Sequence, residues 1–176
     1  KWLQVPYDCG LAIVADKEAH QRSMTQWSSY LPTIGENDRV PSAYVPELSR
    51  RARGTPVWAM LKTLGRHGIA DLVEHHCRCA ARMAERLAAE PGVRVLNEVV
   101  LNQAAVGFGA GDAESRKAAT EAVIARVQAE GTCFVGGANW HGEWIMRVSV
   151  TSGATTIADI ETSADAIIAA WRAVRG

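Results

Sequence analysis

Apolar residues recur every three to four positions between residues 55 and 90, which predicts a helix with one buried face. Thr55-Pro56 places an N-cap residue before a proline at the first helical position, and Pro91-Gly92 ends the pattern. Gly65 and Gly68 interrupt the spacing. We therefore expect two helices in near-continuation.

Two later stretches also predict helices, because each combines helical spacing with capping residues. Asp112 can cap the first, and Gly131 closes it. Residues 156–159 resemble a capping box for the second. The expected buried face of this last helix comprises Ile157, Ile160, Ala164, Ile167, Trp171 and Val174.

Short apolar or alternating runs predict strands. Residues 11–14 are continuously apolar and partly β-branched, which is typical of a strand buried on both faces. Residues 1–5 are expected to form a second strand, which a turn joins to the first. Four further strands are expected between residues 93 and 150, within residues 93–96, 97–108, 133–135 and 144–150. From Thr55 onward the order is helix, strand pair, helix, strand pair, helix. This order predicts an α+β module with an antiparallel sheet covered on one side by helices.

The stretch between Val14 and Thr55 lacks periodicity and is rich in residues that break helices and strands. Residues 23–40 therefore form a long loop in our interpretation, and loops of that length are usually functional or disordered. The only candidate domain boundary lies in this irregular stretch, or extends to the break at Gly65 and Gly68.

Composition narrows the class of protein. The 176 residues are 48% hydrophobic, and 19 basic residues balance 19 acidic ones, so charge predicts neither a nucleic-acid partner nor a membrane surface. No apolar run approaches the roughly 20 residues of a membrane span, and four unpatterned cysteines indicate reduced thiols, so we expect a cytoplasmic protein. A start at Lys-Trp-Leu in mid-strand suggests the C-terminal part of something larger, its first half absent or present as another chain.

The first ten residues, KWLQVPYDCG, place a lysine at the start of an apolar run that ends near Asp-Cys. Alone, such a lysine is weak evidence for catalysis. The segment nevertheless resembles the strand that carries the Schiff-base lysine in group II amino acid decarboxylases, which depend on pyridoxal 5'-phosphate (PLP). The resemblance implies that Lys1 holds the cofactor as an imine, which a substrate amine can displace.

Tyr30 lies within the long loop, and from the sequence alone an ordinary loop aromatic is the better interpretation. The resemblance continues without a gap from Lys1 to Tyr30-Leu31. In the family, a tyrosine at this place closes over the neighbouring subunit's active site, where it delivers the proton that replaces the lost carboxylate. Tyr30 rather than Phe favours simple decarboxylation over conversion to an aldehyde.

Two more residues become candidates for substrate binding. Arg147 stands in an otherwise apolar strand, where it must find an anionic partner, reach the surface or pair with Glu143. The family places an arginine of this strand near the substrate, which favours a role in placing the carboxylate. The segment Ser49-Arg50-Arg51-Ala52-Arg53, followed by Trp58, also matches the family, and it implies that Ser49 tunes selectivity while the arginines are structural or interface groups.

The segment His75-His76-Cys77-Arg78-Cys79 does not predict a metal site. Only His75 and Cys79 share a helix face, and two ligands do not make a structural zinc site. We expect His76 and a cysteine to face the core instead.

The resemblance covers essentially the whole chain and implies an α/β enzyme of PLP fold type I. Residues 1–54 would end the large PLP-binding domain, with a mobile catalytic loop at about residues 22–40. Residues 55–176 would form the C-terminal small α+β domain. The implied enzyme is a homodimer that decarboxylates an L-amino acid, and it needs the missing N-terminal half, so this piece alone should be inactive. An aldehyde-forming or transaminating relative and a non-catalytic dimerisation fragment remain alternatives.

Overall fold

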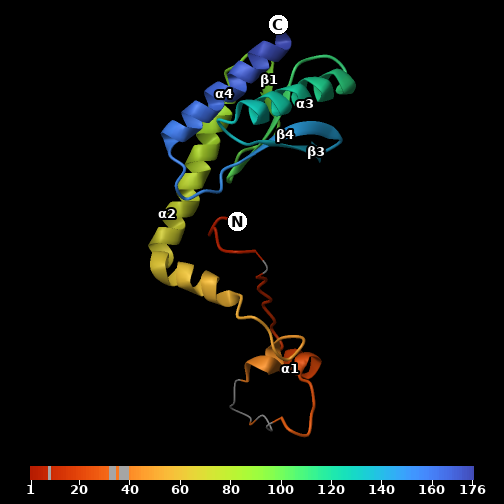
Figure 1. The fold of residues 1–176 in the computed structure, drawn as a ribbon, viewed down its shortest axis with the longest axis vertical. Helices are drawn as coiled ribbons and strands as arrows, with labels where there is room; N and C mark the ends of the chain where they lie inside the picture. The colour runs from red at the N-terminus through yellow and green to blue at the C-terminus, as the bar shows by residue number, and fades with distance from the viewer. Residues whose placement is uncertain (8, 32–34, 36–39) are drawn as a thin grey trace. The chain divides into compact units, whose positions relative to one another are not determined.

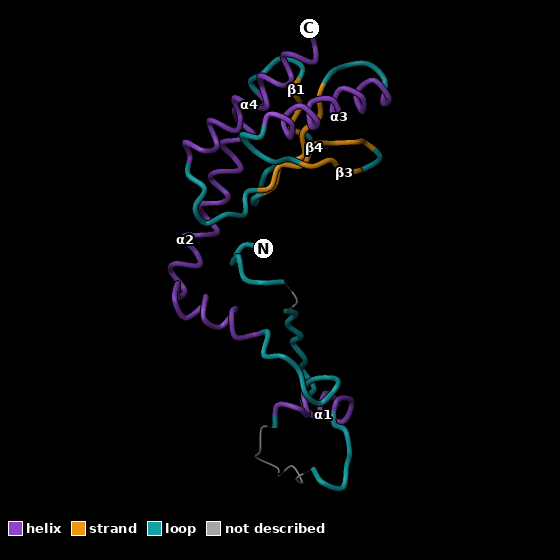
Figure 2. The backbone as a smooth tube through the Cα atoms, viewed as in Figure 1, coloured by secondary structure: helices purple, strands orange, loops and turns teal. Residues whose placement is uncertain are grey.

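The computed structural model describes residues 1–7, 9–31, 35 and 40–176. These residues form two compact units: the first unit comprises Lys1–Gln4 and Leu61–Gly176, and the second unit comprises Val5–Met60. Figure 1 labels most of the helices and strands, and Figure 2 distinguishes helices and strands from the loops by colour.

Four strands of the first unit form one antiparallel sheet in the order β1-β2-β4-β3. Its elements, from the C-terminal part of α2 onward, are α2 (Gly54–Ala88), β1 (Val93–Val95), β2 (Gln103–Phe108), α3 (Ala113–Glu130), β3 (Gly136–Trp140), β4 (Glu143–Ser149) and α4 (Ile157–Arg175). The antiparallel sheet predicted from the sequence is confirmed.

One face of this sheet packs against helices. Val106 and Phe108 of β2 and Met146 of β4 point to the same face and are fully buried. They share one core with apolar side chains of α2, α3 and α4, including Leu87, Val123 and Ile167. Burial of this apolar surface is the main force that stabilises the unit.

The caps of α3 and α4 confirm the predicted ends of these helices. Asp112 accepts a hydrogen bond from the backbone N–H of Ser115 at 2.8 Å, and Gly131 ends α3 in the left-handed conformation at φ 86°. Thr156 and Asp159 form a reciprocal capping box. The expected burial of Ile157 is wrong, because this first residue of α4 remains 43% exposed and the buried face begins at Ile160.

The expected position of β3 is also wrong. The strand covers Gly136–Trp140 rather than residues 133–135, and the turn shrinks to His141-Gly142. Position 137 of this strand has no room for a side chain, because a Cβ atom on Gly137 would lie 2.5 Å from Cζ2 of Trp144. The absence of a side chain lets the indole lie directly on the neighbouring strand.

The break predicted in α2 occurs at Gly65, whose φ of 63° and ψ of −175° are not helical. Glycine adopts this conformation without the steric penalty of a Cβ atom. Beyond Gly65 the helix continues through Gly68, and its expected apolar face is buried at His76, Ala80, Met83 and Leu87.

The second unit contains α1 (Lys17–Met24) and the short 3-10 helix η1 (Pro41–Tyr44). Gln21 of α1 donates a hydrogen bond to the Tyr44 hydroxyl at 2.9 Å, and His20 packs edge-on against the Tyr44 ring. Ala43 is the only buried residue among those described between residues 5 and 60.

Residues 1–5 and 11–14 are all described, and none of them belongs to a strand, so both strand predictions are wrong. Leu11 is 84% exposed and Ile13 fully exposed. A strand needs a neighbour for its backbone hydrogen bonds, and these segments find none within the described chain. Part of the predicted mobile loop, at residues 32–34 and 36–39, lies outside the described residues.

Among the helices that the structure describes, none combines the length and the apolar character that crossing a membrane requires.

Candidate functional site

Lys1 opens a tight turn that packs on the first unit. The backbone N–H of Gln4 donates to the Lys1 carbonyl at 3.0 Å, and Gln4 takes a positive φ of 51°. The side-chain oxygen of Gln4 accepts a hydrogen bond from the backbone N–H of Gly153 at 2.9 Å. The side chain of Lys1 is exposed and makes no ion pair within the described residues. The turn is therefore attached to the unit while the Lys1 amine stays accessible.

The second attachment of this turn is the indole of Trp2. Its ring meets the imidazole of His76 edge to face, with centroids 6.1 Å apart and planes at 86°. This is a favourable geometry for an aromatic pair. His76 itself is completely buried, as the helical spacing of α2 predicts.

Two adjacent histidines of α2 bind the loop before α4. Nε2 of His75 donates to the Thr155 carbonyl at 2.6 Å, and Nε2 of His76 donates to the Ser152 carbonyl at 3.0 Å. Because a carbonyl oxygen only accepts, both rings carry the proton on Nε2. Nδ1 of His76 is buried and has no hydrogen-bond partner within the described residues.

Cys79 lies one helical turn from His75, with its Sγ atom 3.6 Å from Nε2 of that histidine. Burial raises the pKa of the Cys79 thiol, although the nearby Arg78 opposes the shift. The thiol therefore stays protonated and behaves as a small apolar core group. The described residues contain no group of three or more His, Cys, Asp and Glu side chains that could hold a metal ion.

Arg147 is exposed on β4, where it lies between Ala105 of β2 and Gly136 of β3. The alternative of a pair with Glu143 is wrong. Glu143 instead accepts from Arg94 at 2.6 Å and from Arg116 at 3.0 Å, and the hydrogen bond from Arg94 is the main cause that lowers its pKa. Arg147 makes no ion pair within the described chain, so its guanidinium is free to meet an anion.

Tyr30 and Ser49 both belong to the second unit. Tyr30 is 78% exposed in the long segment that follows α1. Ser49 is exposed on the wall of a groove, next to Arg50, which forms an ion pair with Glu47 at 2.8 Å. Other residues that line this groove include Cys9, Gly10, Leu11, Pro41, Arg51 and Arg53.

The four residues singled out in the sequence are thus divided between the two units. Lys1 and Arg147 belong to the first, and Tyr30 and Ser49 belong to the second. Within the described residues, no hydrogen bond or ion pair joins Lys1 to Arg147 or Tyr30 to Ser49. The structure adds the contacts of Trp2, Gln4 and His76, which the sequence does not reveal. The pair of adjacent histidines on a predicted helix is the one sequence feature that points to these contacts.

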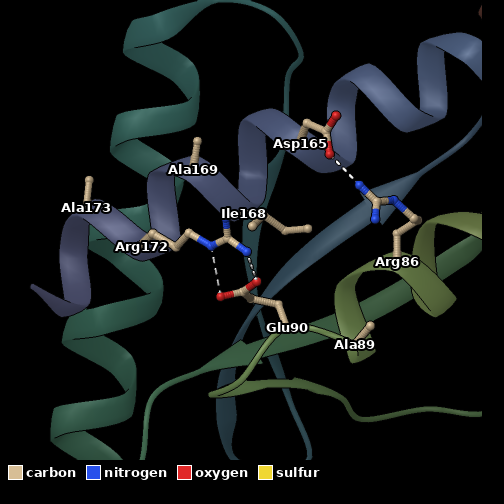
Figure 3. Close-up of a pocket in the computed structure, with 8 residues that line it drawn as sticks. All are labelled: Arg86, Ala89, Glu90, Asp165, Ile168, Ala169, Arg172 and Ala173. Carbon is tan, nitrogen blue, oxygen red and sulfur yellow. Dashed lines mark hydrogen bonds and ion pairs between the residues drawn. The ribbon is translucent and has the colours of Figure 1, made fainter.

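A second hollow, between the end of α2 and α4, is shown in Figure 3. Arg172 holds Glu90 with two hydrogen bonds of 2.6 and 3.1 Å, and Arg175 approaches the same carboxylate at 3.1 Å. Arg86 pairs with Asp165 in the same view. The acids of this hollow are paired with arginines, so the charged groups join the two helices and leave little unsatisfied charge for a ligand.

Comparisons with known proteins agree with this architecture. A family model described as the pyridoxal-dependent decarboxylase conserved domain matches residues 1–109. Histidine decarboxylase of Drosophila melanogaster is 28% identical over 168 residues, which covers 91% of this chain and 18% of the relative. The chain therefore spans about a fifth of the length of that curated relative.

Solved structures share the fold at low sequence identity. Mouse CSAD in its apo form superposes with a TM-score of 0.72 at 15% identity, over 88% of this chain and 34% of the other. Oryza sativa TDC with PLP and tryptamine gives a TM-score of 0.67 at 15% identity, over 72% of this chain and 28% of the other. The architecture is that of PLP fold type I, and the cofactor of the matched family is pyridoxal phosphate. The chain belongs to the pyridoxal-dependent decarboxylase family.

Proposed function

We propose that this chain is the lysine-bearing part of an amino acid decarboxylase, and that the complete enzyme converts an L-amino acid to an amine and carbon dioxide. The observation that carries the proposal is the family match over residues 1–109, which begins at Lys1. We further propose that the rest of the large domain completes the active site and that the enzyme is a homodimer.

The chemistry of Lys1 fits the aldehyde of pyridoxal phosphate. Its side-chain amine is exposed and unpaired within the described residues, so it is free to bond covalently to the aldehyde carbon. Bound there, the cofactor would supply an electron sink for the charge that a departing carboxylate leaves behind. Partners for the cofactor ring and phosphate are proposed to come from the remainder of the enzyme.

Each of the other candidate residues has a defined task in this proposal. Decarboxylation breaks one carbon–carbon bond, releases carbon dioxide and leaves an electron pair at the α-carbon that must take up one proton. The exposed phenol of Tyr30 would deliver this proton from a loop that closes over the site. The unpaired guanidinium of Arg147 would orient the substrate carboxylate, and Ser49 would line the pocket for the substrate side chain.

The test is whether pyridoxal phosphate attaches specifically to Lys1. The chain would be co-expressed with a polypeptide that supplies the rest of the decarboxylase fold, reduced with borohydride and digested for mass spectrometry. We expect a phosphopyridoxyl group on the Lys1 peptide, its loss in Lys1→Ala, and its retention in the control Lys17→Ala, which removes an exposed lysine of α1. The 176-residue chain alone should carry no such group.

Equal labelling of Lys17 and Lys1 would contradict the proposal, because it would show non-specific reaction with exposed amines. An assembled protein that binds no cofactor would instead favour a non-catalytic dimerisation role. Product analysis separates the remaining alternatives: an amine supports decarboxylation, an aldehyde would identify an aldehyde-forming enzyme, and a 2-oxo acid would identify a transaminating one.

A further inference from the structure

We propose that His76 is a positioning residue for Lys1, which it fixes through two separate chains of contacts. This inference rests on the function proposed above. Both chains begin at the buried imidazole on α2 and end in the turn of residues 1–4, and all of their members belong to the first unit.

The first chain of contacts is direct. The imidazole of His76 packs edge-on against the indole of Trp2, which is the residue next to Lys1. Aromatic pairs of this geometry contribute about 0.5–1.5 kcal/mol beyond the burial of their surface. The contact therefore restrains the direction in which the backbone leaves Lys1.

The second chain of contacts passes through the loop before α4. Nε2 of His76 donates to the Ser152 carbonyl at 3.0 Å, and the next residue, Gly153, donates its N–H to Gln4 at 2.9 Å. The neighbouring His75 holds Thr155 at 2.6 Å and so fixes the other side of the same loop. Gln4 in turn closes the turn by donating to the Lys1 carbonyl.

The surroundings of His76 show which interactions a histidine makes at this position and an apolar residue would not. The ring is fully buried, and its Nδ1 atom has no partner within the described residues. A buried polar atom without a hydrogen bond is costly, and an apolar side chain would avoid that cost at Nδ1 but would lose the hydrogen bond to the Ser152 carbonyl. The Nε2 donor together with the ring face is what His76 provides and an apolar residue would not.

Hydrogen exchange of the 176-residue chain, followed by mass spectrometry, tests the positioning role. In His76→Leu, which removes the donor and the imidazole, the amides of Gln4 and Gly153 should exchange about fivefold faster or more. The amides of residues 104–108 and 145–148 should stay protected. A merely structural role of His76 would accelerate exchange of those core strands as well.

Two further variants separate the two chains of contacts. His76→Gln retains a side-chain N–H for the Ser152 carbonyl but lacks the aromatic ring. The amide of Gly153 should therefore still exchange slowly, whereas the amide of Gln4 should exchange faster. Trp2→Leu should accelerate Gln4 without a change at the core, and it serves as the second test if His76→Leu does not fold. His67→Asn, at an exposed histidine of the same helix, is the matched control and should change neither amide.

Unchanged exchange at Gln4 and Gly153 in His76→Leu, with an intact core, would overturn the inference. The proposed function fails by a different observation, namely a missing phosphopyridoxyl group on Lys1 of the unsubstituted assembled protein. Slow exchange at Gln4 that depends on His76 would support the positioning role whatever that labelling experiment gives.

Discussion

Glu90 is a buried carboxylate that joins the end of α2 to α4 (Figure 3). The two hydrogen bonds from Arg172 are the main cause that lowers the pKa of Glu90, and the charge of Arg175 adds to the shift. A carboxyl whose pKa is lower in the folded than in the unfolded chain stabilises the fold above the unfolded value. That contribution is lost as the pH falls through the folded value.

We therefore expect Glu90→Gln to lower the melting temperature at about pH 7, with a difference from the unsubstituted chain that shrinks towards about pH 3. Thermal unfolding followed by circular dichroism across this range would measure it. Glu121→Gln removes an exposed carboxylate of α3 that makes no ion pair in the described structure, and it should have little effect at any pH. A pH-independent loss in Glu90→Gln would show that packing, not charge, is responsible.

For single residues, the sequence predicts a role when that role depends on residues close by in the chain. Asp112 caps α3 through a residue three positions away, so its role follows from local chemistry. His76 meets Ser152 across 76 positions, and no local pattern reveals that contact. The burial of His76 follows from helical spacing, whereas its partners follow from tertiary folding. Lys1, Tyr30, Ser49 and Arg147 stay predictions drawn from a family resemblance.

Among the elements, β3 shows how a strand can depend on the absence of side chains. Gly137 faces Trp144, and a Cβ atom at this position would lie 2.5 Å from the indole, whereas a Cβ at Gly136 would meet nothing within 4 Å. Both glycines pair with β4. Substituting each of these two adjacent glycines therefore separates the effect of a clash with Trp144 on stability from the effect of losing a glycine in the strand.

Gly137→Ala should destabilise the chain by about 1–3 kcal/mol, because the methyl group displaces Trp144. Gly136→Ala should change stability by less than about 0.5 kcal/mol and is the matched control. Urea unfolding measures both free energies of unfolding. Equal effects of the two substitutions would mean that strand propensity, rather than contact with the indole, determines the result.

The strand β3 also shows which part of the fold the local sequence does not predict. Glycine-rich residues 136–142 indicate a turn when only local preference is considered, and pairing with β4 overrides that preference. The prediction for residues 11–14 has the opposite error. Their apolar pattern is typical of a strand, but they form none because the described chain offers no partner strand. Helix ends are set locally, whereas strand positions are set by neighbours.

On the scale of the whole molecule, the two units differ in how completely they bury apolar surface. The core of the first unit is formed by α2, the four-stranded sheet, α3 and α4. In the second unit Leu11, Ile13, Trp27 and Tyr30 are exposed. Exposed apolar side chains in such number are typical of an interaction surface.

Hybrid dimers provide the test of Tyr30 at this scale. We propose that Tyr30 of one subunit serves the Lys1 of the other, so Lys1→Ala and Tyr30→Phe homodimers should each form amine at least about 100-fold more slowly than the unsubstituted enzyme. Mixing the two variants during assembly should restore about a quarter of the full rate, because half of the dimers are hybrids with one intact site. Tyr7→Phe, at another exposed tyrosine, is the control. If the mixture stays as inactive as its components, Tyr30 acts within its own subunit; if Tyr30→Phe keeps full amine formation, Tyr30 does not deliver the proton.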